Sequence, residues 1–241
     1  MTSTRRIAVA GGVFYLITFI AILRLVLYGP VLTDPNYIVS SASDTPALWA
    51  GVIETIVALA GIGTAVALFP VVKRQNESFA IGFVASRIVE AGIIFVGIIS
   101  LLSIVTLRQN LGAAVGAEAT TLVTTGKSLV VIQNWTFLFG QTLMPGVNAL
   151  LLGYLMYRSR LVPRLIPALG LIGGPLMISS VFGQIIGINE QYSVWSGIAL
   201  VPIFIWELSL GLYLTFKGFK PAPIVAPSLA NGTVNAAYAA A

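Results

Sequence analysis

Five ionisable side chains lie within long apolar stretches of this 241-residue chain: Arg24, Glu54, Arg87, Glu90 and Glu207. Charged groups in apolar surroundings are costly, so they normally face a protein interior and pair with one another. Here three carboxyl groups accompany two guanidinium groups. If all five are buried together, one carboxyl group has no basic partner, and desolvation and a neighbouring carboxylate both disfavour its ionised form. The set could therefore hold a proton or carry one.

The chain contains no cysteine and no histidine. Disulfides, thiolate nucleophiles, haem ligation by histidine and the usual zinc sites are therefore excluded. The commonest general base is missing as well. Proton chemistry must depend on carboxylates, lysine or tyrosine, and we expect no catalytic residue, no metal and no cofactor.

The elements that carry these side chains are predicted to be transmembrane helices. The chain is 57% hydrophobic and 9% charged, whereas a soluble domain has about 25% charged residues. Strands of a membrane barrel would be shorter, more numerous and alternating in polarity. We predict an all-α fold, a polytopic bundle of six helices, each longer than the roughly 20 residues a crossing needs. The expected spans are about residues 7–28, 47–72, 79–107, 129–157, 165–188 and 194–217.

The basic residues predict how the bundle is oriented. Nine Lys and Arg residues lie at the two chain ends and in the second and fourth connections, while only Arg108 and Lys127 lie in the other connections. The positive-inside rule then places both the N- and the C-terminus in the cytoplasm. The net charge of +5 is explained by topology, and we expect no nucleic-acid partner.

This orientation brings three of the buried charges to one depth. Arg87 and Glu90 lie about eight and eleven residues from the cytoplasmic start of the third span, and their i,i+3 spacing puts them on one helix face. Glu207 lies about ten residues from the inner end of the sixth span. Arg24 and Glu54 could form a second pair nearer the outer surface. The first three residues are the candidate buried polar site.

Two interpretations of this polar site remain open. In one, Arg87 bridges Glu90 and Glu207 and only clamps the third helix to the sixth. In the other, the surplus acid belongs to a functional site, since perturbed carboxyl groups occur both at functional sites and in structural networks.

The fourth span carries amide side chains around a Pro145-Gly146 pair, and the fifth carries another. Proline removes a backbone hydrogen bond and tends to kink a spanning helix. The amides could line a cavity or could bond to neighbouring helices. The candidates are Asn134, Gln141, Asn148 and Gln184.

Three other segments bear on the organisation of the chain. The first span continues past a typical signal-peptide core and lacks a cleavage site, so we expect it to be retained. The segment 108–128 is the longest connection and is expected to be either a short surface helix or a mobile loop. Residues 1–220 form the transmembrane domain, and the tail 221–241, rich in Pro, Ala and small polar residues, is expected to be disordered.

Several segments are similar to one known family. They are residues 5–19 (RRIAVAGGVFYLITF), 30–38 (PVLTDPNYI), 67–74 (ALFPVVKR), 86–91 (SRIVEA), 157–164 (YRSRLVPR), 206–211 (WELSLG) and 217–219 (KGF). Over about residues 5–220 the chain resembles bacterial and archaeal membrane proteins of the "domain of unknown function 4386" family. Arg87-x-x-Glu90 and Glu207-x-x-x-Gly211 are the most specific parts. The resemblance implies a multi-pass protein of a prokaryotic plasma membrane, and it implies no activity, substrate or catalytic residue.

Three functions are compatible with these features. The first is a small-solute or proton-coupled transporter that uses the Arg87, Glu90 and Glu207 cluster. The second is a non-catalytic accessory, lipid-binding or sensor module, in which the cluster is a structural clamp. An enzyme acting on a lipid through carboxylates is the least expected. The partner is the lipid bilayer, a small-molecule ligand is unidentified, and a homo-oligomer is left open.

Overall fold

The computed structural model describes residues 3–111 and 115–222, and every regular element within these ranges is helical. Six helical units in this part of the chain are long and apolar enough to cross a bilayer. The chain is therefore an all-α, multi-pass membrane protein, and the predicted fold class is confirmed. The units run over Ser3–Leu27, Thr45–Val72, Glu77–Leu111, Ala117–Ser159, Leu165–Ile185 and Val194–Phe216.

Short changes of helical geometry divide two of these units. A 3-10 turn follows α1 in the first unit, and a π-helical segment separates α6 from α7 in the fourth. The bounds are α1 Ser3–Thr18, η1 Phe19–Leu23, α2 Arg24–Leu27, α3 Gly29–Thr33, η2 Tyr37–Val39, α4 Thr45–Val72, α5 Glu77–Leu111, α6 Ala117–Thr136, η3 Phe137–Leu143, α7 Met144–Ser159, α8 Leu165–Ile185 and α9 Val194–Phe216.

The segment expected to be the longest connection is mostly helical. Helix α5 continues to Leu111 and α6 begins at Ala117. Hydroxyl groups along the start of α6 donate to carbonyls one turn earlier, as Thr121 does to Ala117 and Thr125 to Thr121. These hydroxyls are therefore satisfied within the helix itself. The expected tail lies outside the described residues, apart from Pro221 and Ala222.

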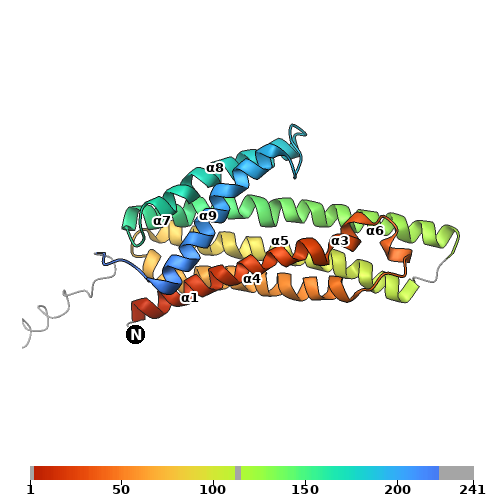
Figure 1. Ribbon diagram of the computed structural model, residues 1–241, viewed down its shortest axis with the longest axis horizontal. Coiled ribbons are helices and arrows are strands. Elements are labelled where there is room, and N and C mark those ends of the chain that lie inside the picture. Colours follow the sequence, from red (N-terminus) through yellow and green to blue (C-terminus); the bar gives the residue numbers. More distant parts are fainter. Residues whose placement is uncertain (1–2, 112–114, 223–241) are drawn as a thin grey trace, which may run out of the picture.

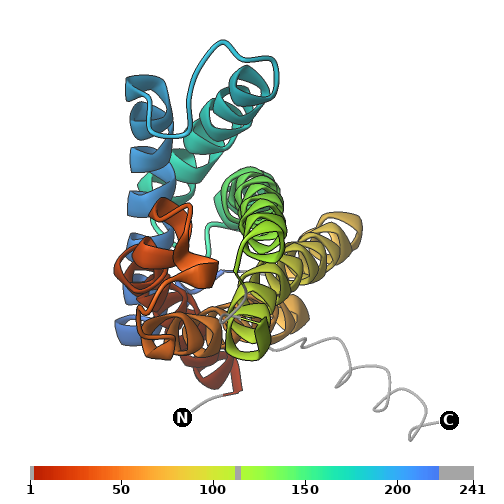
Figure 2. The ribbon, with the colours of Figure 1, turned by 90° about the vertical axis from the view of Figure 1, so that its right-hand side faces the viewer.

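The six units form a closed ring in chain order. Each unit packs against the next, through α1–α4, α4–α5, α5–α7, α7–α8 and α8–α9, and α9 then packs against α1. The start of α1 and the end of α9 lie at the same end of the molecule (Figure 1). Seen along the long axis, the tip of the α8–α9 hairpin leans away from the other helices (Figure 2), and α5 and α6 extend beyond it along the molecule (Figure 1).

Glycines allow the closest helix contacts in this ring. A Cβ atom added at Gly12 of α1 would lie 2.8 Å from the Gly211 carbonyl oxygen and 2.6 Å from the Thr215 nitrogen of α9. A Cβ atom at Gly170 of α8 would lie 2.8 Å from the indole of Trp206. Small residues let helix backbones approach in lipid, so these positions bring the hairpin and the first helix together.

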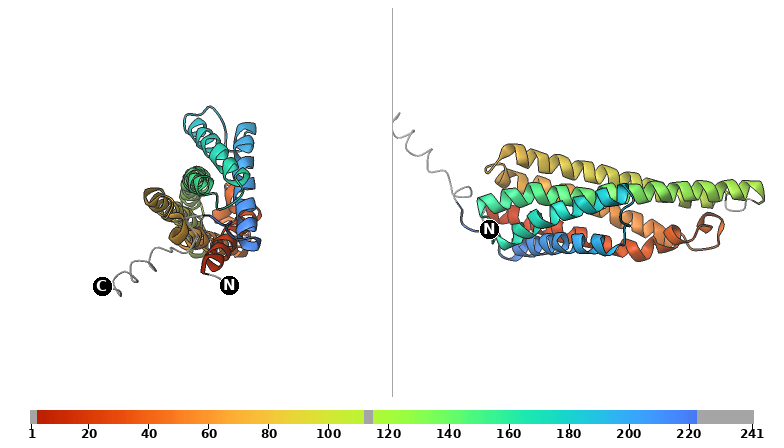
Figure 3. Two further views of the ribbon diagram at one scale, coloured as in Figure 1. Left: turned by 90° about the vertical axis from the view of Figure 1, so that its left-hand side faces the viewer. Right: turned by 90° about the horizontal axis from the view of Figure 1, so that it is seen from above.

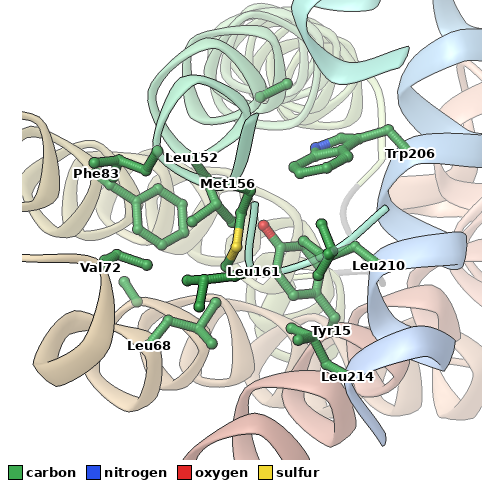
Figure 4. Packing of buried hydrophobic residues seen from close by; sticks show 14 of the residues in the cluster. Tyr15, Leu68, Val72, Phe83, Leu152, Met156, Leu161, Trp206, Leu210 and Leu214 are labelled. Atoms are coloured by element: carbon green, nitrogen blue, oxygen red, sulfur yellow. The ribbon is translucent and has the colours of Figure 1, made fainter. Parts of the chain in front are cut away.

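The apolar core lies toward the end of the bundle that holds the termini. Trp206, Tyr15, Phe83 and Met156 are fully buried there and come from four different helices (Figure 4). Trp206, which the hydropathy pattern puts near mid-depth, is packed against α8 rather than exposed to lipid. The polar centre described next begins at the hydroxyl group of Tyr15.

Candidate functional site, a buried polar centre

Arg87 of α5 is the centre of an inner charge cluster. Its Nη1 lies 3.0 Å from Glu90 Oε2, and its Nη2 lies 3.3 Å from Glu207 Oε1 of α9. The same Nη2 donates a hydrogen bond of 3.0 Å to the hydroxyl group of Tyr15. The guanidinium side chain is only 4% exposed. One buried cation therefore holds groups from α1, α5 and α9 together.

Glu90 has further partners on the fourth unit. Asn148 Nδ2 donates to Glu90 Oε2 over 2.7 Å, and Ser86 donates to Asn148 Oδ1. Glu90 is therefore held by a cation and an amide, whereas Glu207 pairs with Arg87 across the interior. The Glu207 side chain is also more exposed, at 18% against 10% for Glu90. Of the two acids, Glu207 is the less constrained.

A second charge cluster, formed by Arg24, Glu54 and Gln141, lies farther along the bundle from the end that holds the termini. Arg24 Nη1 is 3.1 Å from Glu54 Oε1, and Gln141 bridges the pair. The amide of Gln141 accepts from Arg24 over 2.9 Å and donates to Glu54 over 2.8 Å. The Arg24 guanidinium also lies over the ring of Phe137, 4.3 Å from its centroid. The triad links the first, second and fourth units.

A cavity of about 120 Å³ separates the two clusters. Arg87, Glu90 and Glu207 line it on one side and Gln141 on the other, with Thr18 between them. Two buried N–H groups of the described residues, Nε of Arg24 and Nε of Arg87, have no hydrogen-bond partner in the protein. Buried donors are normally satisfied by protein or by ordered water. The cavity has three charged side chains and one amide among apolar residues, which suits water or a small solute.

The family model described as "Domain of unknown function (DUF4386)" matches residues 10–218. The chain belongs to this family. No curated protein and no solved structure matches this chain. Both charge clusters of this DUF4386 protein, and the cavity between them, lie within the matched residues.

The amides predicted to line a cavity have four different surroundings in the DUF4386 bundle. Gln141 lines the central cavity and Gln184 lines a second one, while Asn148 bonds to Glu90. Asn134 is exposed, and its neighbour Gln133 is buried instead. Successive residues on a helix are turned by about 100°, so a shift of one residue moves a side chain out of the interior.

Two members of the inner cluster, Tyr15 and Asn148, could not be assigned to it from the sequence. Tyr15 stands in an apolar run, where a tyrosine is an ordinary core residue, and no spacing relates it to Arg87. For Asn148 the sequence leaves both cavity lining and a bond to a neighbouring helix open, and it does not single out Glu90 as the partner. In both cases the information missing from the sequence is which helices are neighbours, because the contacts join α1 to α5 and α7 to α5.

A third charged group lies at the end opposite the termini, where the connection between the first and second units meets the last turn of α5. Arg108 pairs with Asp44, and Arg108 Nε donates to the Ser40 carbonyl over 3.1 Å. Tyr37 donates to the same carboxylate over 3.1 Å. Burial, and then the hydrogen bond to Asp44, raise the pKa of the Tyr37 phenol above its ordinary value. This group fastens the segment between α3 and α4 onto the end of α5.

Proposed function

We propose that this membrane protein is a proton-coupled transporter of a small solute, with the central cavity as its binding site. The observation that carries the proposal is that two carboxyl groups, Glu90 and Glu207, share one guanidinium group beside that cavity. With Arg24 already paired to Glu54, the surplus acid belongs to the inner cluster. Intramembrane acids next to water-filled cavities are typical of proton relays.

Glu207 is the group that we assign to proton binding. Its contact with Arg87 is 3.3 Å long, and it connects α9 with α5, which are not neighbours in the ring. A protonated Glu207 has no net charge to attract Arg87, so proton binding would loosen this link across the interior. A ligand shifts a conformational equilibrium when it binds two states differently. Proton binding would in this way favour a state in which the α8–α9 hairpin is freer to move.

Glu90 and Arg87 would keep the other half of the site in place. Glu90 accepts from both Arg87 and Asn148, so it keeps two partners when Glu207 is neutral. The Nε–H group of Arg87, which has no protein acceptor, provides a donor for water or solute beside the cavity that Arg87 lines. We further propose the plasma membrane of a prokaryote as the location, with both termini in the cytoplasm, because of the uneven distribution of basic residues.

The alternative is a structural role in which the same contacts are a clamp. Arg87 has three partners from three helices, and such a network could fix the packing without moving anything. The protein would then be a non-catalytic accessory, lipid-binding or sensor module. The two functions differ in what removal of the Glu207 charge does.

The test is proton flux into proteoliposomes loaded with a pH-sensitive dye, measured with a panel of small polar solutes. Glu207→Gln keeps the shape of the side chain but cannot exchange a proton. We expect it to reduce solute-dependent flux to the level of protein-free liposomes, with thermal stability unchanged. Glu190→Gln, a carboxylate in the connection between α8 and α9, is the matched control and should transport normally.

Infrared difference spectroscopy gives a second readout that needs no solute. The carbonyl band of a protonated carboxyl group should be present in the wild type and absent in Glu207→Gln. Full flux in Glu207→Gln would disprove the role of this residue. An absence of flux in the wild type, together with a marked loss of stability in Glu207→Gln, would favour the clamp.

A further inference from the structure

A second cavity lies beside the connection between α8 and α9, and its lining is mostly apolar with several polar side chains. Its volume is about 350 Å³, and it opens beside Tyr192, which is 84% exposed. Hydroxyl and amide groups of Thr142, Ser180, Gln184 and Ser196 line it. Three of these polar side chains bond to one another and the rest of the lining is largely apolar, so the space is suited to a small solute that has both apolar and hydrogen-bonding parts. We call it the vestibule.

The vestibule and the central cavity are stacked along the same helix faces. On the first unit Leu25 lines the vestibule, while Ala21 and Thr18 line the central cavity. On the fourth unit Phe137 lines the vestibule and Pro145 the central cavity. Leu25, Ala21 and Thr18 are three or four residues apart, about one helical turn of 5.4 Å, whereas Phe137 and Pro145 are eight residues apart, about two turns. The two spaces are therefore consecutive along the bundle axis.

Gln141 is the residue that the two cavities have in common. Its amide is held from both sides, by Arg24 over 2.9 Å and by Glu54 over 2.8 Å. It lies in the π-helical segment η3, four residues before Pro145. Because proline has no N–H, the carbonyl of Gln141 loses its usual α-helical partner. Isolated π-helical turns occur often at functional sites.

We propose that the vestibule is the entry site for the solute and that Gln141 is the gate between it and the central cavity. The lining residues of the vestibule carry no formal charge, so the solute class is small, neutral and hydrogen-bonding. The central cavity, at about 120 Å³, is below the roughly 300 Å³ of sites for larger ligands. The gate opens when the amide leaves Arg24 and Glu54, which keep their direct contact of 3.1 Å. This proposal rests on the proposed transport function.

The native chain lacks cysteine, so single cysteines can report on water access without background. Gly197 lines the vestibule, and a Cβ atom there meets nothing within 4 Å, so Gly197→Cys fits without strain. Ile198, the next residue, is 52% exposed and does not line it, and Ile198→Cys is the matched control. A charged, membrane-impermeant thiol reagent added at the end opposite the termini should modify Gly197→Cys and not Ile198→Cys. Equal rates at the two positions would disprove the vestibule.

Thr18→Cys reports on the central cavity beyond the gate. With Gln141 in place, a small neutral thiol reagent should modify it slowly, and a charged reagent more slowly still. Gln141→Ala removes two hydrogen bonds to charged groups, so the rate should rise about tenfold or more. An unchanged rate in Gln141→Ala would disprove the gate, and faster reaction with the charged reagent would disprove the neutral solute class.

These rates do not depend on transport. If the thiol reagents modify Gly197→Cys and Thr18→Cys at the expected rates but the protein shows no solute-dependent proton flux, the vestibule and the gate are supported and the transport function is disproved. The reverse result, flux with no access to Gly197→Cys, would require the solute to enter by another route.

Discussion

Arg87 is the residue on which the inner cluster depends. Its guanidinium group contacts Glu90, Glu207 and Tyr15 at once, and a planar fork with several donors is suited to that geometry. Its spacing to Glu90 and its depth relative to Glu207 could be predicted from the sequence, because both follow from helix periodicity and span length. The contact with Tyr15 could not, because it depends on α1 packing beside α5.

Substitution of Arg87 should be strongly destabilising. Arg87→Met leaves two carboxyl groups without a cation, and breaking a buried ion pair costs about 3–5 kcal/mol. Arg87→Lys keeps the charge but not the fork, so we expect an intermediate loss. Thermal unfolding in lipid nanodiscs measures both effects.

The triple variant Arg87→Met, Glu90→Gln, Glu207→Gln is the control for this experiment. It has no buried charge left in the inner cluster, so it should recover part of the stability that Arg87→Met loses. If the triple variant were less stable than Arg87→Met, the loss would have to come from packing around residue 87 rather than from unpaired carboxylates.

At the scale of the elements, hydropathy predicted the number and order of the helices but not their lengths. Helix α5 has 35 residues, about 52 Å at 1.5 Å per residue, and the α6–η3–α7 unit is longer still and runs the length of the molecule (Figure 3). The extra turns carry polar residues, Arg108, Gln109 and Asn110 at the end of α5 and four threonines within 117–128 of α6, where an apolar scale gives no signal. The π-helical turn at Phe137–Leu143 is likewise a matter of hydrogen-bond register, which composition does not reveal.

The contact of α1 with α9 makes a specific prediction about one glycine. Gly12→Val would force a side chain against the Gly211 carbonyl and Thr215, and overpacking of this kind costs about 1–3 kcal/mol. Gly92→Val is the matched control, since a Cβ atom at Gly92 of α5 meets nothing within 4 Å. We expect a lower unfolding temperature for Gly12→Val only. Equal losses in the two variants would mean that helix propensity, not contact, is responsible.

At the scale of the whole molecule, the ends of the chain are joined. Arg5 donates to the carbonyls of Leu214, Thr215 and Phe216 at the end of α9, over 2.9–3.1 Å. These carbonyls have no partner within their own helix, and a cation there also favours the helix dipole. The sequence predicts that both ends are on one side but not that they touch.

The side on which they lie is a prediction that reporter fusions can check. A fluorescent protein fused after Lys220 should fold and fluoresce in the cytoplasm, because nine basic residues lie at that end of the bundle. A periplasmic reporter such as alkaline phosphatase, inserted at Asn189 between α8 and α9, should be active. Activity of the phosphatase at the chain end, with a dark fluorescent fusion, would reverse the orientation.

Because the ring closes between its first and last helices, the order of synthesis has a consequence for assembly. Helix α1 enters the membrane first, yet one of its two ring neighbours, α9, is made last. Until α9 arrives, Arg87 can reach Glu90 and Tyr15 but not Glu207. Its cluster has a balanced charge during most of translation, and the surplus acid is delivered with the final helix. A nascent chain released before α9 would therefore carry an open ring and would lack Glu207.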